Sequence, residues 1–148
     1  MNNFQGWINL YKPKNITSFQ AVKKIKKKFL INKIGHAGTL DPLATGILPI
    51  AIGKTTKLTP YVNQSYKKYI FTISWGRQTT TDDSEGKIIN ESNFLPELDN
   101  INSKIREFIG NIYQKPPKVS AININGVRAY KLQRNDIEFE IKSREVFV

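Results

Sequence analysis

Two side chains in one glycine-rich stretch, residues 33–46, could carry out chemistry. The stretch holds His36, the only histidine in the chain, and Asp41, the only carboxylate in the first 81 residues. An aspartate carboxylate can act as a nucleophile toward an electron-poor carbon of a base or a sugar. The glycines of the stretch give its backbone the freedom for sharp turns and for close approach to a ligand. Taken by itself, a lone aspartate before a proline is more typical of a turn.

The positive charge of the chain is concentrated around Asp41. The first 81 residues carry 13 basic groups and one acidic group, whereas the last 67 carry 10 basic and 11 acidic groups. The whole chain has a formal charge of +11 and a pI near 9.9. Such a surface attracts polyanions, so we expect Asp41 to be a reactive group delivered to a nucleic acid. An anionic membrane surface is the weaker alternative, because no apolar run approaches the ~18 residues of a spanning helix.

The bulk composition is that of an ordinary folded protein. With 148 residues, 39% of them hydrophobic and 24% charged, the chain is long enough for one domain with a core. It contains no cysteine, which excludes disulfides and thiolate metal sites. The N-terminus lacks the pattern of a signal peptide. We therefore expect a cytoplasmic protein.

The elements that would position Asp41 follow from hydrophobic periodicity. Residues 7–11 alternate and predict a strand that ends at Lys12-Pro13, and the apolar run 47–52 predicts a buried strand. A helix between them would be capped by Thr17 or Ser18. Its apolar face would consist of Val22, Ile25 and Phe29.

Five lysines crowd the rest of this helix: Lys23, Lys24, Lys26, Lys27 and Lys28. A lysine-rich helix face is usually a solvated surface. Here no acidic residue is near, and like charges four residues apart destabilise a helix. An external anion such as RNA phosphate is the better explanation.

One apparent nucleotide motif is rejected. Gly53-Lys54-Thr55 matches the last three residues of the phosphate-binding loop pattern. That pattern also needs a glycine five residues before Gly53, where this chain has Leu48.

The second half predicts a run of strands around one helix. Residues 69–75 alternate and predict the clearest strand, and 82–86 predict a turn before a returning strand at 87–89. The acidic residues of this turn are expected to form the turn rather than a metal site. A helix is predicted from Pro96 to Gly110, with an apolar core face of Leu98, Ile101, Ile105, Phe108 and Ile109. Asn125-Gly126 predicts a tight hairpin, and alternation at 137–141 and 146–148 predicts further strands.

The segment Lys33–Pro49 (KIGHAGTLDPLATGILP) closely resembles the signature of the bacterial tRNA pseudouridine-55 synthases of the TruB type. Similar segments extend along nearly the whole chain. Residues 6–13 resemble the family's opening segment with its Lys-Pro pair, 68–82 the strand of its active-site tyrosine, and 114–130 its RNA-gripping loop.

The resemblance implies an α+β fold, in which a mixed, mostly antiparallel sheet is flanked by helices. Residues 1–148 would form the N-terminal part of the catalytic domain, incomplete at its C-terminus. In the family, a later part of that domain supplies an arginine that pairs with the catalytic aspartate, together with an aromatic residue and a leucine. Many members also carry a small C-terminal RNA-binding domain. We expect this chain to lack both parts.

The implied activity is the conversion of one uridine in the T loop of tRNA to pseudouridine. By resemblance Asp41 is the nucleophile and attacks either C1′ of the ribose or C6 of the ring. The glycosidic bond breaks, the base rotates, and C5 rejoins the sugar. The uridine must flip out of the loop, which costs a few kcal/mol of stacking. No cofactor or metal is implied, and the expected partner of a monomeric protein is the T arm of tRNA, not a membrane.

Other roles are also carried over by resemblance. His36 matches the histidine that fills the space left by the flipped base, and Tyr69 matches the tyrosine that stacks on the target base and helps to remove the C5 proton. Without the family, His36 could equally be a packed imidazole and Tyr69 a core aromatic. Lys12 and Pro13 are expected at the floor of the pocket. The candidates for phosphate contacts are Lys23, Lys24, Lys27, Lys54, Lys115, Lys118 and Arg128.

The chain departs from the family in the RNA-gripping loop, where members usually carry Tyr in place of Val119 and Lys in place of Asn123. If chemistry is lost with the later part of the catalytic domain, one alternative is a non-catalytic RNA-binding fragment or tRNA chaperone module. Another is a guide-dependent pseudouridylase that needs partner proteins and a guide RNA. The continuous bacterial-type segments argue against the latter.

Overall fold

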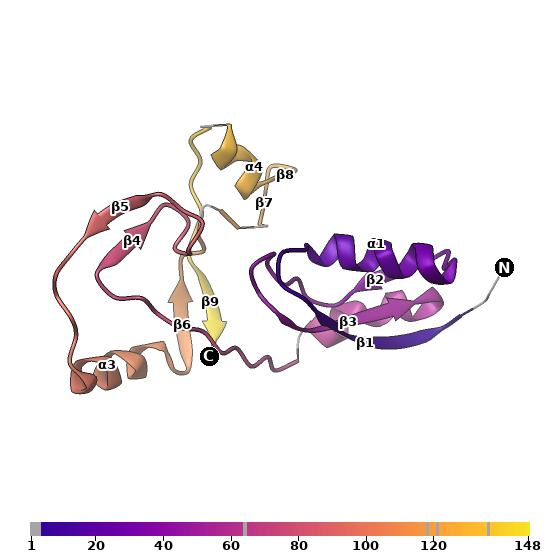
Figure 1. Ribbon diagram of the computed structural model, residues 1–148, viewed down its shortest axis with the longest axis horizontal. Coiled ribbons are helices and arrows are strands. Elements are labelled where there is room, and N and C mark those ends of the chain that lie inside the picture. Colours follow the sequence, from indigo (N-terminus) through magenta and orange to yellow (C-terminus); the bar gives the residue numbers. More distant parts are fainter. Residues whose placement is uncertain (1–3, 64, 118, 121, 136) are drawn as a thin grey trace. The chain divides into compact units, whose positions relative to one another are not determined.

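The computed structural model describes residues 4–63, 65–117, 119–120, 122–135 and 137–148, and it divides into two compact units. Unit 1 is Met1–Ile70 and unit 2 is Phe71–Val148. The elements of unit 1 are β1 (Gly6–Lys12), α1 (Ser18–Phe29), β2 (Ile34–His36), β3 (Gly46–Ile52), the 3-10 helix η1 (Gly53–Leu58) and α2 (Thr59–Asn63) (Figure 1).

Unit 1 is built on a three-stranded antiparallel sheet in the order β1-β3-β2. The register pairs Leu10 with Leu48, and Ile50 with both Ile8 and His36. This arrangement confirms the strands predicted at 7–11 and 47–52. β3 lies in the centre of the sheet, and Leu48 and residues 50–52 of its apolar run are buried.

The core of unit 1 lies between this sheet and α1, which runs along one face of it (Figure 1). Ala21 and Val22 of the helix pack against Leu48 and Ile50 of β3, which are 1% and 0% exposed. Phe29 was predicted to join this face but is exposed. The helix ends there, because Leu30 takes the left-handed conformation and its N–H closes the last turn onto Lys26 O.

Unit 2 consists of small antiparallel pairs of strands and short helices. Strands β4 and β5 pair, as do β6 with β9 and β7 with β8. The elements are β4 (Arg77–Thr79), β5 (Ile88–Glu91), α3 (Leu98–Ile105), η2 (Arg106–Phe108), β6 (Asn111–Gln114), β7 (Asn123–Ile124), β8 (Val127–Arg128), α4 (Ala129–Arg134) and β9 (Arg144–Phe147). The α+β class with mostly antiparallel sheets is thus confirmed.

Both turns predicted in unit 2 are present. Asn125 and Gly126 have φ values of 49° and 88°, the positive values that a two-residue hairpin turn requires. The acidic turn joins β4 to β5, and Asp83 organises it by accepting hydrogen bonds from the Thr81 hydroxyl and the Glu85 N–H. No group of three or more potential metal ligands lies among the described residues.

Two predicted strands of the second half are absent. Residues 69–75 and 137–141 are irregular. Ile70 and Phe71, adjacent in sequence, are 92% and 76% exposed, so the alternation at 69–75 does not bury one face. A strand needs a hydrogen-bonded neighbour, and no described strand pairs with 69–75.

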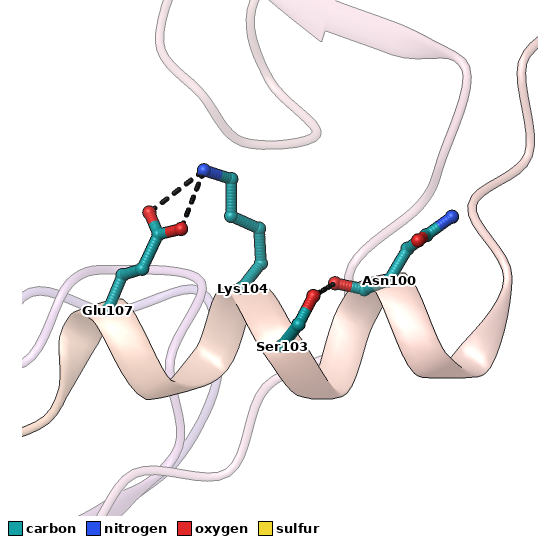
Figure 2. Close-up of polar contacts among 4 residues, drawn as sticks. All are labelled: Asn100, Ser103, Lys104 and Glu107. Carbon is teal, nitrogen blue, oxygen red and sulfur yellow. Dashed lines mark hydrogen bonds and ion pairs between the residues drawn. The ribbon is translucent and has the colours of Figure 1, made fainter.

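The apolar face predicted for the second helix is also not buried in unit 2. Leu98, Ile105 and Phe108 are each more than half exposed. Local polar contacts stabilise this helix instead, as Figure 2 shows: the Ser103 hydroxyl donates to Asn100 O, and Lys104 Nζ lies 2.8 Å from Glu107 Oε2. An exposed ion pair of this kind contributes less than ~1 kcal/mol. Because the apolar face is also exposed, α3 has little tertiary support.

Among the described residues, none of the helices combines the length and the apolar character needed to span a bilayer.

Candidate active site

An open cavity of about 590 Å³ lies within unit 1, and Asp41 and Tyr69 both line it. Its walls come from the loop 37–41, from residues 44–49 at the start of β3, from Val62 and from residues 65–70. The volume is within the ~300–1,000 Å³ typical of sites for small ligands. Because the Asp41 side chain is exposed, the carboxylate can reach a molecule that enters this cavity.

Hydrogen bonds to other segments of unit 1 hold the loop that carries Asp41 on both sides of that residue. Leu40 exchanges two hydrogen bonds with the buried hydroxyl of Ser18, at 2.9 Å each. Pro42 O accepts from the Asn15 N–H at 2.8 Å, and Asp41 O accepts from the Ala44 N–H. Asn15 has a φ of 65°, a conformation that asparagine tolerates better than most residues. The backbone at Asp41 is therefore well defined.

Lys12 lies beneath this loop. Its side chain is 0% exposed, and Nζ donates to Pro13 O at 2.9 Å, Ile16 O at 2.8 Å and Pro42 O at 3.4 Å. Three donors matched to three carbonyls make burial of an ammonium group tolerable. Lys12 and Pro13 were expected at the floor of the pocket, but neither lines the cavity. A buried Lys12 ammonium cannot contact RNA directly, so its place in this structure is a support for the loop.

His36 is the last residue of β2 and directly precedes Ala37, which lines the cavity. Its Nδ1 is hydrogen-bonded to Gly38 O. A carbonyl can only accept, so Nδ1 is the donor in this hydrogen bond. The ring is half-buried and is not part of the cavity lining.

Residues 65–70 line one part of the cavity, and they include Tyr69 and two lysines. Tyr69 is 67% exposed. Lys67 and Lys68, the two residues before it in the sequence, line the same cavity. Lys67 Nζ donates to Asn63 O, whereas the ammonium of Lys68 has no partner among the described residues. These two cations were not among the phosphate candidates. Their position directly before Tyr69 in the sequence is the signal that could have identified them.

The phosphate candidates are divided between the two units. Lys23, Lys24 and Lys27 are exposed on α1, and Lys54 is exposed on η1. Lys115 and Arg128 are exposed in unit 2, and Lys118 lies outside the described residues. Lys26, Lys27 and Lys28 also occupy the last turn of α1, where the helix dipole favours cations and offsets part of their repulsion.

Residues 26–148 match the model of the TruB family pseudouridylate synthase N-terminal domain. The chain belongs to this family. The matched region begins within α1 and contains Asp41 and every described residue of the cavity lining.

Curated relatives are similar in sequence to this chain over nearly its whole length. It is 56% identical over 143 residues to a tRNA pseudouridine synthase B of Ehrlichia ruminantium (strain Gardel), a match that covers 97% of this chain and 48% of that protein. It is 55% identical over 141 residues to the protein of that name from Wolbachia pipientis subsp. Culex pipiens, covering 95% and 40%. The chain thus spans about half the length of these curated relatives.

Among solved structures, the fold is similar to a chain of a Cbf5–Nop10–Gar1 complex. The TM-score is 0.53 at 31% identity, covering 82% of this chain and 31% of that chain. A chain of an H/ACA RNP bound to a substrate RNA containing 2′-deoxyuridine gives a TM-score of 0.51 at the same identity and covers 76% and 30%.

Proposed function

We propose that this chain supplies the nucleophile-bearing part of a tRNA pseudouridine synthase that isomerises the uridine at position 55 in the T loop. The observation that carries the proposal is the placement of Asp41 and Tyr69 on one open cavity of unit 1. Such a cavity can accept a flipped uridine, with the ring of Tyr69 available for stacking and Asp41 for nucleophilic attack.

The charge distribution supports RNA as the substrate. Unit 1 carries 12 basic residues and Asp41 as its single acid, whereas unit 2 carries 11 basic and 11 acidic residues. The whole net charge of +11 therefore belongs to the unit that holds the cavity. Lysines on α1 and η1 would contact phosphates around the T arm, in a manner that is independent of sequence and sensitive to salt.

The proposed reaction is balanced without a co-reactant. The Asp41 carboxylate attacks C1′ of the ribose or C6 of the uracil ring, and the bond between N1 and C1′ breaks. The base rotates, C5 bonds to C1′, the proton on C5 leaves with the help of Tyr69, and N1 ends with a proton. The carboxylate is then released unchanged. This sequence uses only a positioned nucleophile and a proton acceptor, the two kinds of group that line the cavity.

The relatives favour an enzyme that acts on tRNA alone over a guide-dependent one. Proteins named tRNA pseudouridine synthase B are 44–56% identical to this chain, whereas the chains from the Cbf5 and H/ACA complexes are 31% identical. We therefore propose tRNA as the partner, in the cytoplasm and without a guide RNA.

A second candidate function is tRNA binding without turnover. No ion pair to Asp41 is formed by the residues that the structure describes. A nucleophilic carboxylate that lacks a cationic partner is held less well in the geometry for attack. The basic surface of unit 1 would still bind RNA in that case.

Turnover on an unmodified tRNA transcript tests both candidates. The 148-residue chain would be compared with Asp41→Asn and with the control Asp82→Asn, a change in the acidic turn of unit 2. Pseudouridine in the T loop of the wild type and of Asp82→Asn, with none in Asp41→Asn, is the expected result. Turnover by Asp41→Asn would exclude Asp41 as the nucleophile. Tight binding of tRNA by all three proteins without turnover would establish the binding function instead.

A further inference from the structure

Ser18 is the first residue of α1, yet its hydroxyl is not used by its own helix. The residue is 2% exposed, and Oγ donates to Leu40 O and accepts from the Leu40 N–H, both at 2.9 Å. One hydroxyl therefore satisfies both backbone polar groups of Leu40, which directly precedes Asp41. A serine hydroxyl can donate one hydrogen bond and accept others, and this pairing uses it both as donor and as acceptor.

The neighbouring Thr17, not Ser18, caps the N-terminus of α1. The Thr17 hydroxyl accepts from the Gln20 N–H at 3.0 Å, and the Gln20 side chain accepts from the Thr17 N–H at 2.7 Å. This is a complete capping box, so the N-terminus of α1 does not depend on the Ser18 side chain. Two adjacent hydroxyls thus have separate tasks: Thr17 stabilises the helix, and Ser18 holds the loop.

Ser18 holds the backbone on the N-terminal side of Asp41, whereas other contacts hold the C-terminal side. The carbonyl of Pro42 is held from the C-terminal side by Lys12 and by the Asn15 N–H. Ser18 holds the N-terminal side through Leu40. The Asp41 side chain projects from the short backbone segment between these two attachments, and a shift of either one would move its carboxylate.

We infer that Ser18 is a positioning residue for the nucleophile: its hydroxyl fixes the backbone of Leu40 and so sets the direction of attack by Asp41. The inference rests on the proposed role of Asp41. Ser18 does not line the cavity. Its loss would lower kcat, because misplacement of a reacting group by about 1 Å costs on the order of 100-fold in rate. The KM for tRNA would change little, because phosphate contacts of exposed lysines do not involve Leu40.

The experiment compares Ser18→Ala with Thr17→Ala and Ser18→Thr. In Ser18→Ala we expect kcat to fall on the order of 100-fold with KM within about twofold of the wild type. Thr17→Ala should lose helix stability while keeping kcat, and Ser18→Thr should recover most of the turnover because it restores the hydroxyl. A purely structural role would make the two alanine variants lose stability and activity in parallel.

A second readout does not depend on activity. Amide hydrogen exchange by NMR should show faster exchange of the Leu40 N–H in Ser18→Ala, and of the Gln20 N–H in Thr17→Ala. Unchanged exchange at Leu40, or an unchanged kcat in Ser18→Ala, would overturn the inference. Turnover by Asp41→Asn would instead remove the proposed function, so the two failures are distinguishable.

Discussion

The ammonium of Lys12 donates a hydrogen bond to the carbonyl of Pro42, the residue directly after Asp41. The same group also donates to Pro13 O and Ile16 O, and no part of the side chain is exposed. A cation at the end of β1 is thereby buried under the loop that carries the candidate nucleophile. The contact joins two segments that are 30 residues apart in sequence.

Lys12→Met should therefore destabilise unit 1. Methionine has a similar length but donates no hydrogen bond, so three carbonyls lose their shared donor. Hydrogen bonds to charged groups contribute about 1.5–3 kcal/mol each, and unpaired buried groups are costly. We expect a loss of about 2–4 kcal/mol in the free energy of unfolding, measured by urea denaturation. Lys14→Met, at a neighbouring exposed position, is the control, and equal stability of the two variants would contradict the prediction.

The sequence predicts much of unit 1 because local signals and burial agree there. The apolar run of β3 and the alternation of β1 each specify a strand, and β3 buries Leu48 and residues 50–52. The sequence left the helix cap open between Thr17 and Ser18. In unit 2, tight turns were also predictable, since Asn125-Gly126 requires no distant partner. The apolar alternation at 69–75 failed, because a strand is completed by its neighbour and none of the described strands pairs with it.

The site was predictable in part. The signature stretch identifies Asp41, and the structure places it on a cavity with Tyr69. The buried contacts of Lys12 could not be predicted, because nothing in a Lys-Pro pair shows that the ammonium faces three backbone carbonyls. Ser18 was recognised only as a possible helix cap, because its contact with Leu40 spans 22 residues and exists only in the folded chain.

Tyr69 should affect both binding and proton removal. Tyr69→Phe keeps the ring for stacking but loses the hydroxyl, so we expect kcat to fall about 100-fold or more at nearly constant KM. Tyr69→Leu also loses the stacking, which is worth ~1–3 kcal/mol per base, and should raise KM as well. Tyr61→Phe is the control, because Tyr61 is similarly exposed and does not line the cavity. Steady-state kinetics on the tRNA transcript measure these effects, and an unchanged kcat in Tyr69→Phe would exclude the proton-removing role.

The β4–β5 hairpin should lose stability in acid. The Thr81 hydroxyl, 2.6 Å from the Asp83 carboxylate, is the main cause that lowers the pKa of Asp83, and the Glu85 N–H acts in the same direction. A depressed pKa in the folded state means that the stabilisation is present above the unfolded pKa and disappears as the pH falls through the folded one.

An NMR titration of the Asp83 carboxyl carbon tests this pH dependence. Thr81→Val should raise the pKa of Asp83 toward its ordinary value, because the main hydrogen bond to the carboxylate is lost. Thr80→Val is the control: the Thr80 hydroxyl accepts from the Lys87 N–H rather than donating to Asp83. A pKa of Asp83 that is the same in Thr81→Val and the wild type would show that this hydroxyl is not the cause.

The lysines of α1 should determine the salt dependence of tRNA binding. Lys23, Lys24 and Lys27 are exposed, and unit 1 has no acid other than Asp41 to pair with them. If each neutralises one phosphate, its replacement by glutamine should reduce the slope of log Kd against log salt by roughly 0.7–0.9. Lys104→Gln is the matched control, because Lys104 is already paired with Glu107 in unit 2. Filter binding at several salt concentrations gives the slopes. The same slope in the triple glutamine variant, the Lys104→Gln control and the wild type would mean that α1 presents a solvated surface and that tRNA is held by other cations.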